Sequence, residues 1–207
     1  MKKMPRTKDP DNKEGLVIAV FDFDGTLTYK STTLPFLKFV SPLRFYLFVL
    51  LIYPVLIAYF CKLISVDTLN YYLCWLFFKN KTVSEIQSLG KVFAQQKLSK
   101  FLRKEAIQKL RLHQNRGDKC LLATSAYAVY INHWAEIERF DGVVSTEFET
   151  NGQVFTGKLL GKSCYGEQKI KKLAPFFSVK AVIYAYGDSR GDRELLEYAT
   201  HPFYRCF

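Results

Sequence analysis

The sequence predicts an α/β fold: a Rossmann-like parallel sheet with helices on both faces and an inserted helical cap. Three short apolar runs, at residues 16–21, 119–123 and 181–186, end abruptly in polar or acidic residues. Buried parallel strands have this pattern where they open into ligand-binding loops. Apolar residues at helical spacing in 99–115 and 127–139 predict the crossovers. Because the carboxyl ends of parallel strands share one sheet edge, we expect the three polar ends to converge on one site.

The composition indicates one substantial core and an anionic partner. The 207 residues, 49% of them apolar, suffice for one core with one inserted subdomain. The formal charge is +11, and between residues 79 and 119 eleven Lys or Arg residues stand against three acidic ones. Nucleic acid, anionic lipid and phosphorylated substrates are all anionic, so the positive charge alone does not distinguish among these three classes of partner. The five scattered cysteines have no metal-ligand spacing and are expected to be reduced thiols in a cytosolic setting.

The order of the elements predicts the domain boundaries. Residues 1–14 are polar and charged and are expected to form a flexible tail. Residues 15–32 and 106–207 carry the strand-and-helix alternation of the catalytic core, and residues 33–105 interrupt it as a helical, apolar cap. Within the core, Asn151-Gly152 between two short runs predicts a hairpin or flap at 147–161.

The cap contains an apolar segment of near-membrane length. Residues 45–61 carry no formal charge and would span about 26 Å as a helix, against a hydrocarbon core of about 30 Å. Pro54 would kink or break that helix. A single crossing would also place Asp22 and Asp188 on opposite sides of the bilayer. We therefore expect the segment to dip into one leaflet or to lie along the interface, the alternative being a buried cap in a soluble protein.

The first strand leads into the strongest chemical signal, the run Asp-Phe-Asp-Gly-Thr-Leu-Thr at 22–28. Asp22 and Asp24 are separated by one residue, and Gly25 permits the sharp turn that presents them together. Two such carboxylates can divide the work of phosphate transfer. One attacks phosphorus, while the other protonates the departing alcohol and later activates water.

This run resembles the first motif of the haloacid dehalogenase superfamily, and the other three motifs follow in order. Thr124 closes the second apolar run, Lys169 lies in Gly-Glu-Gln-Lys-Ile, and Asp188 begins Asp-Ser-Arg-Gly-Asp after the third run. The spacing of the glycines between 157 and 166 resembles the phosphoserine-phosphatase-related branch, subfamily IB. The resemblance therefore implies the haloacid dehalogenase type of sheet and phosphatase chemistry through an aspartyl-phosphate intermediate.

The resemblance also implies roles for particular residues. It makes Asp22 the nucleophile and Asp24 the proton donor, supported by Gly25 and Thr26. The remaining roles are phosphate binding by Thr124, the backbone amide of Ser125 and Lys169, metal binding by Asp188, and support by Asp192. The metal is expected to be Mg²⁺, held by the Asp22 side chain, the Asp24 backbone carbonyl, the Asp188 side chain and water, because oxygen ligands suit this ion.

Within subfamily IB, the aromatic cap and the run 184–189 are most similar to phosphatidylglycerophosphatases of the C type. This similarity implies hydrolysis of phosphatidylglycerol phosphate to phosphatidylglycerol on the cytoplasmic face of a bacterial inner membrane. The partners would be a phosphorylated anionic lipid substrate and a membrane surface contacted through the apolar cap. The sequence leaves the oligomeric state undetermined.

Two alternatives remain open. The first is a cytoplasmic phosphomonoesterase that acts on a small soluble ester such as phosphoserine or a sugar phosphate. The second is a non-catalytic module that binds nucleic acid through residues 79–119. That stretch offers only Phe93 and Phe101 as stacking platforms, and all four catalytic positions are filled, so we expect no nucleic-acid partner.

Overall fold

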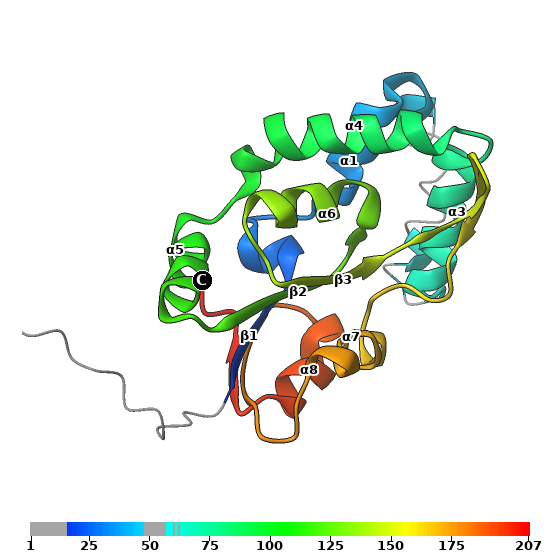
Figure 1. Ribbon diagram of the computed structural model, residues 1–207. Coiled ribbons are helices and arrows are strands. Elements are labelled where there is room, and N and C mark those ends of the chain that lie inside the picture. The colour runs from blue at the N-terminus through cyan, green and yellow to red at the C-terminus, as the bar shows by residue number, and fades with distance from the viewer. Residues whose placement is uncertain (1–15, 48–56, 60, 62) are drawn as a thin grey trace, which may run out of the picture.

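The computed structural model describes residues 16–47, 57–59, 61 and 63–207, arranged as a five-stranded parallel sheet with helices on both faces and a helical cap at one end (Figure 1). The sheet order is β3-β2-β1-β6-β7, and all its pairings are parallel. This architecture confirms the predicted fold class. The strands are β1 (Val17–Phe21), β2 (Lys119–Tyr127), β3 (Gly142–Thr146), β6 (Val182–Gly187) and β7 (His201–Tyr204).

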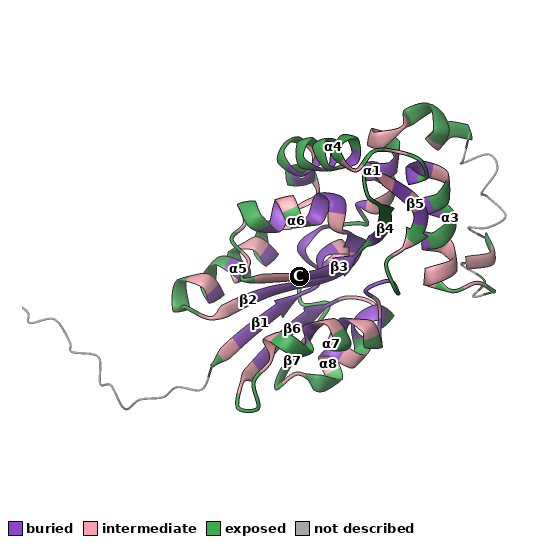
Figure 2. Cartoon of the chain, turned by 45° about the vertical axis from the view of Figure 1, so that its right-hand side comes forward, coloured by how far each residue is buried: buried purple, intermediate pink, exposed green. Residues whose placement is uncertain are grey.

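The helices cover the two faces of the sheet and build two apolar layers. In Figure 1, α5 (Lys104–Arg116) and α6 (Ala128–Ile137) lie above the sheet, and α7 (Glu167–Leu173) and α8 (Arg193–Tyr198) lie below it. The central strand β1 contributes Ala19 and Phe21 to one layer and Ile18 and Val20 to the other, and all four side chains are buried. Figure 2 shows this burial along the sheet. Burial on both faces explains why β1 is continuously apolar.

The cap is formed by α1 (Thr33–Val40), α3 (Val66–Phe78) and α4 (Val83–Gln96), and the short helix η2 (Leu98–Phe101) leads back toward the core. Helix α4 packs on core helix α6, where Gly90 approaches so closely that a Cβ atom there would lie 1.8 Å from the Val129 carbonyl oxygen. The predicted hairpin is present as β4 (Phe148–Asn151) and β5 (Val154–Leu159), and β5 packs against α3. The cap is therefore held from two sides by core elements.

Two predictions fall largely outside the described residues: the flexible tail at 1–14 and most of the apolar run at 45–61. Within the part of the chain that the structure describes, no helix has both the length and the apolar character required to cross a bilayer.

Candidate active site

The topology places the first and fourth motifs side by side. From β1 the sheet grows through β2 and β3 in one direction and through β6 and β7 in the other, so the order reverses between β1 and β6. Open α/β sheets bind ligands in the crevice at such a reversal. Phe21 pairs with Tyr186 there, and the Asp22 backbone N–H donates to the Tyr186 carbonyl at 2.9 Å. The turn after β1 and the loop after β6 therefore open at the same point.

Lys169 joins the nucleophile to the fourth motif. Its Nζ lies 2.6 Å from Asp22 Oδ1 and 2.5 Å from Asp192 Oδ1, and all three side chains are buried. The residue lies in the first turn of α7, which begins after Gly166 at a φ of +59°. Three residues that are distant in the sequence thus form one buried ion network.

Asp192 supports this network rather than facing open space. Its Oδ1 accepts from Lys169, and its Oδ2 accepts from the backbone N–H groups of Asp188 and Ser189 and from the Ser189 hydroxyl. Both Asp192 oxygens therefore accept hydrogen bonds, one from Lys169 and the other from the loop after β6.

Gly25 and Thr26 shape the opposite wall. Gly25 has a φ of +91°, and a Cβ atom there would lie 2.3 Å from Asp188 Oδ2, so only glycine permits this close approach. The Thr26 hydroxyl donates to Asp188 Oδ1 at 3.4 Å. The turn after β1 is thus fitted against the Asp188 carboxylate.

The second motif lies at the same end of the sheet. Phe21 of β1 is in register with Leu122 of β2, so Thr124 and Ser125 lie just beyond the level of Asp22. Thr124 is buried, and its Oγ1 accepts from the Ala126 backbone N–H at 3.0 Å, which leaves the hydroxyl proton to be donated. This strand runs on to Tyr127, so the two residues lie within β2 and not in the loop that the sequence predicted.

The carboxylates form a group suited to a hard cation. Asp22, Asp188 and Asp192 each offer an oxygen, and the three oxygens lie within 4.8 Å of one another. Burial raises the pKa of Asp22 against the opposing charge of Lys169, and burial followed by the charge of Asp192 raises the pKa of Asp188. A single lysine does not balance three clustered acids, and an all-oxygen set fits Mg²⁺. The residues present therefore fit the expected cofactor.

Asp24 points its carboxylate toward the start of the cap. Its Oδ1 accepts from the backbone N–H and the hydroxyl of Thr32, at 2.9 and 2.7 Å, and its Oδ2 accepts from the Ser31 hydroxyl. Ser31 and Thr32 were not predicted as site residues, because their only sequence signal is the position of two hydroxyl residues just before a cap helix. Burial raises the pKa of Asp24 to about 6, against these hydrogen bonds, which favour its charged form.

This pKa predicts the pH dependence of turnover. A proton donor must be protonated, so the competent fraction of Asp24 falls as the pH rises through about 6. We therefore expect kcat/KM for an alkyl phosphate to decline above that pH. The substrate phosphate also titrates near pH 6. In an Asp24→Asn variant, the single-turnover release of the phenolate from an aryl phosphate isolates the substrate titration, because this first step needs no proton from residue 24. An identical decline in the variant and the wild type would show that Asp24 does not cause it.

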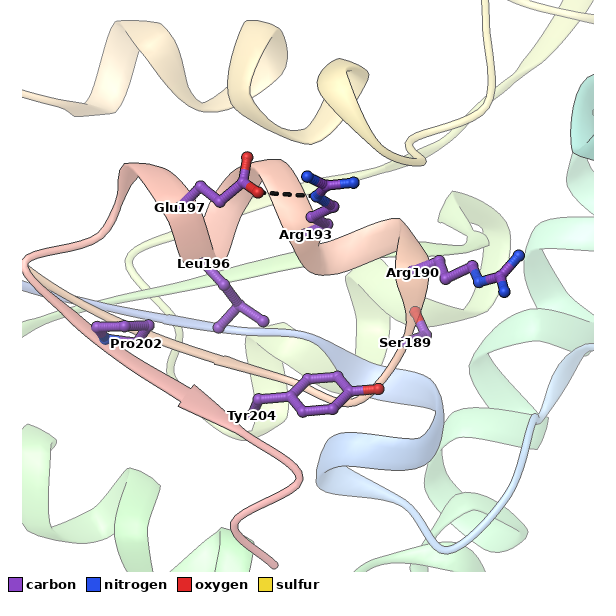
Figure 3. A pocket seen from close by; sticks show the side chains of 7 residues that line it. All are labelled: Ser189, Arg190, Arg193, Leu196, Glu197, Pro202 and Tyr204. Atoms are coloured by element: carbon purple, nitrogen blue, oxygen red, sulfur yellow. Dashed lines mark hydrogen bonds and ion pairs between the residues drawn. The ribbon is translucent and has the colours of Figure 1, made fainter.

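A separate hollow of about 450 Å³ lies between α8 and β7, lined mainly by apolar atoms (Figure 3). Figure 3 shows Arg193 and Glu197 paired along α8, and Ser189 in the segment that leads into this helix. Of the predicted site residues, none lines this hollow. The catalytic candidates gather instead at the β1–β6 junction.

The sequence pattern that defines the haloacid dehalogenase-like hydrolases matches residues 19–197, which include all four motifs. The chain belongs to this family. Protein CicA of Caulobacter vibrioides is 31% identical over 197 residues, which cover 94% of this chain and 87% of CicA. The family match and the similarity to CicA both extend over almost the whole described core.

Solved structures of other proteins are similar at lower identity. A Bordetella pertussis Tohama I protein of unknown function superposes with a TM-score of 0.76 and 20% identity, over 91% of this chain and 89% of that one. A phosphoserine phosphatase solved as a phospho-aspartyl intermediate analogue superposes with a TM-score of 0.58 and 14% identity, over 90% of this chain and 84% of that one. These likenesses show the shared fold.

Proposed function

We propose that this haloacid dehalogenase-like hydrolase is a Mg²⁺-dependent phosphomonoesterase that works through an aspartyl-phosphate on Asp22. The observation that carries the proposal is the buried contact of 2.6 Å between Lys169 Nζ and Asp22 Oδ1, in a cluster with Asp188 and Asp192. A lysine in this position orients the attacking carboxylate and offsets charge that develops on the phosphoryl group. Bound Mg²⁺ would reduce the repulsion between the anionic nucleophile and a dianionic phosphate.

The chain's own residues then perform two steps. In the first, Asp22 attacks phosphorus while Asp24 protonates the leaving alcohol, and the Thr124 hydroxyl with the Ser125 amide holds the phosphoryl oxygens. In the second, Asp24, now deprotonated, takes a proton from water, which attacks phosphorus and releases inorganic phosphate and free Asp22. The Asp24 carboxylate can take both parts because its pKa of about 6 lies near physiological pH.

The favoured substrate class is a small soluble phosphomonoester. The support is the similarity of the core and cap to phosphoserine phosphatases over 90% of the chain. We expect phosphate release from such esters with Mg²⁺, and a loss of on the order of 10³-fold or more when the metal is chelated and restored by adding it back. The measurement is a panel of phosphoserine, sugar phosphates and phosphatidylglycerol phosphate in mixed micelles. Turnover that survives chelation would contradict the metal requirement.

A second candidate, phosphatidylglycerol phosphate, rests on one structural observation. The outer face of α3 exposes Tyr71, Tyr72 and Trp75, and Leu43, Tyr46 and Leu47 are exposed in the segment after α1. Cations border these rings: Lys79 lies over Trp75, and Lys38 lies over Tyr46. Exposed aromatic residues beside basic ones are typical of a surface that lies in the headgroup region of an anionic membrane.

If the exposed aromatic face of α3 contacts a membrane, its removal should weaken vesicle binding. Replacing both Tyr72 and Trp75 with Ser should weaken binding to phosphatidylglycerol vesicles about 30-fold, since each half-exposed ring loses roughly 1 kcal/mol of burial in lipid. Vesicle co-sedimentation measures this change. Leu112→Ser, at an equally exposed position of α5 on the core, is the matched control and should bind as the wild type does. Equal weakening by both variants would show that the cap face has no special role.

A further inference from the structure

The Asp24 carboxylate is hydrogen-bonded to two neighbouring residues in the chain segment that enters the cap. Three donors reach its carboxylate, and all belong to Ser31 and Thr32. Thr32 directly precedes helix α1 and is completely buried, whereas Ser31 is exposed. The orientation of the proposed proton donor therefore depends mainly on where Thr32 is held.

The direction of the next hydrogen bond follows from the number of protons available. When Asp24 is ionised, its carboxylate can only accept, so the Thr32 hydroxyl donates its one proton to Asp24 Oδ1 at 2.7 Å. The oxygen of Tyr130 lies 2.9 Å from the same Thr32 hydroxyl, so Tyr130 must donate and Thr32 must accept. A directed chain thus runs from Tyr130 through Thr32 to Asp24.

Tyr130 is well suited to be the fixed end of this chain. It lies on core helix α6 and is completely buried. Its ring packs against Phe36 of α1 and Phe93 of α4, at centroid distances of 4.5 and 5.4 Å. The Tyr130 side chain therefore contacts cap helices α1 and α4 and also the Thr32 hydroxyl that binds Asp24.

We propose that Tyr130 is a positioning residue for the reaction: acting through Thr32, it orients the Asp24 carboxylate for proton transfer to the leaving group. The inference rests on the proposed function, because it assumes that Asp24 is the proton donor. It adds that a hydroxyl on the core helix, two hydrogen bonds away from Asp24, fixes the geometry of that donor. Because the Tyr130 ring also packs against the cap, the donor's geometry depends on how the cap packs on the core.

The leaving group provides a sensitive test of proton donation. In the first step a P–O bond to the ester oxygen breaks as the bond from Asp22 to phosphorus forms, and an alkoxide must receive the Asp24 proton as it leaves. A 4-nitrophenolate leaves as a stabilised anion and needs little help. Because kcat/KM covers only the steps up to departure of the alcohol, the later hydrolysis by water does not affect the comparison.

The experiment compares 2-phenylethyl phosphate with 4-nitrophenyl phosphate for each variant, in the full chain with Mg²⁺. We expect Thr32→Val to lower kcat/KM for the alkyl ester about 100-fold, and Tyr130→Phe to lower it about tenfold, since a misplaced acid loses part of a 10²–10⁴-fold contribution. For the aryl ester, both variants should remain within about threefold of the wild type. Thr32→Ser keeps the donor and should restore the alkyl activity.

Tyr127→Phe is the matched control. Tyr127 is equally buried and lies at the start of the same helix, but its hydroxyl donates to Asn70 of α3 and not to Thr32. Its removal should leave the ratio of alkyl to aryl activity unchanged.

Other results would contradict either the positioning role of Tyr130 or the proposed function. Equal losses on both esters, or none, in Thr32→Val and Tyr130→Phe would overturn the positioning role while the proposed phosphatase stands. If Thr32→Val does not fold, Tyr130→Phe, which removes one hydroxyl and keeps the ring, decides alone. A wild-type chain that hydrolyses neither ester would overturn the proposed function and this inference with it.

Discussion

Replacing Asp22 with Asn should lower kcat by on the order of 10⁴-fold or more, because the neutral amide cannot attack phosphorus. The change is nearly isosteric and removes one buried charge, while Lys169 keeps its contact of 2.5 Å with Asp192. We therefore expect the variant to fold, with a melting temperature close to that of the wild type. Phosphate release under saturating Mg²⁺ measures the loss, and thermal unfolding followed by circular dichroism measures the stability.

Asp24→Asn is the informative partner of this variant. It keeps the nucleophile but lacks the base that activates water, so an aryl phosphate should load Asp22 and then stall. Acid-quenched protein should carry hydroxylamine-labile phosphate in Asp24→Asn and none in Asp22→Asn. An Asp22→Asn protein that still turns over, or that still becomes labelled, would refute the covalent mechanism.

The sequence predicted the parts of the site that local patterns encode. The apolar run before Asp22 and the one before Asp188 end where β1 and β6 end, so the neighbouring positions of these acids followed from strand-end geometry. Strand β7 was not predicted, because it is an exposed edge strand that contains Pro202. Proline weakens the pattern that identifies a strand. Such an edge depends on tertiary pairing with β6 more than on its own composition.

Contacts between distant residues were beyond prediction for a different reason. Thr32 and Tyr130 are 98 positions apart, and neither occupies a recognisable motif. Their contact depends on how the cap packs against α6, and no single segment of the sequence determines this packing. His113 illustrates the same limit: it lies in no motif, and it is buried between Asp118 and the hydroxyl of Tyr186. Burial lowers the pKa of this histidine, against the hydrogen bond with Asp118, which favours its charged form.

Replacing Lys169 with Met should affect both stability and catalysis. Two buried carboxylates, those of Asp22 and Asp192, would lose their shared cation, and removing one partner of a buried ion pair costs about 3–5 kcal/mol. For a chain of this size, we expect the melting temperature to fall by on the order of 10 °C. Without the cation that orients Asp22, kcat should fall on the order of 10³-fold.

The pH dependence separates an electrostatic cause from a packing defect. In the Lys169→Met protein, the folded state must ionise carboxyls in a buried site, so their folded pKa lies above that of the unfolded chain. The penalty is then largest above the folded pKa and shrinks as the pH falls toward the unfolded value near 4. Saturating Mg²⁺ should also recover part of the lost stability, because the ion supplies the missing positive charge.

Lys171→Met makes the same substitution two residues later in the same helix. Lys171 pairs with Glu167 on the surface, where both side chains are more than half exposed, so its loss should change neither the melting temperature nor kcat appreciably. Thermal melts from pH 4 to pH 8, with and without Mg²⁺, compare the two variants. If Lys169→Met loses stability equally at all pH values, the loss comes from packing, and Lys169 is not the counter-charge on which the proposed mechanism depends.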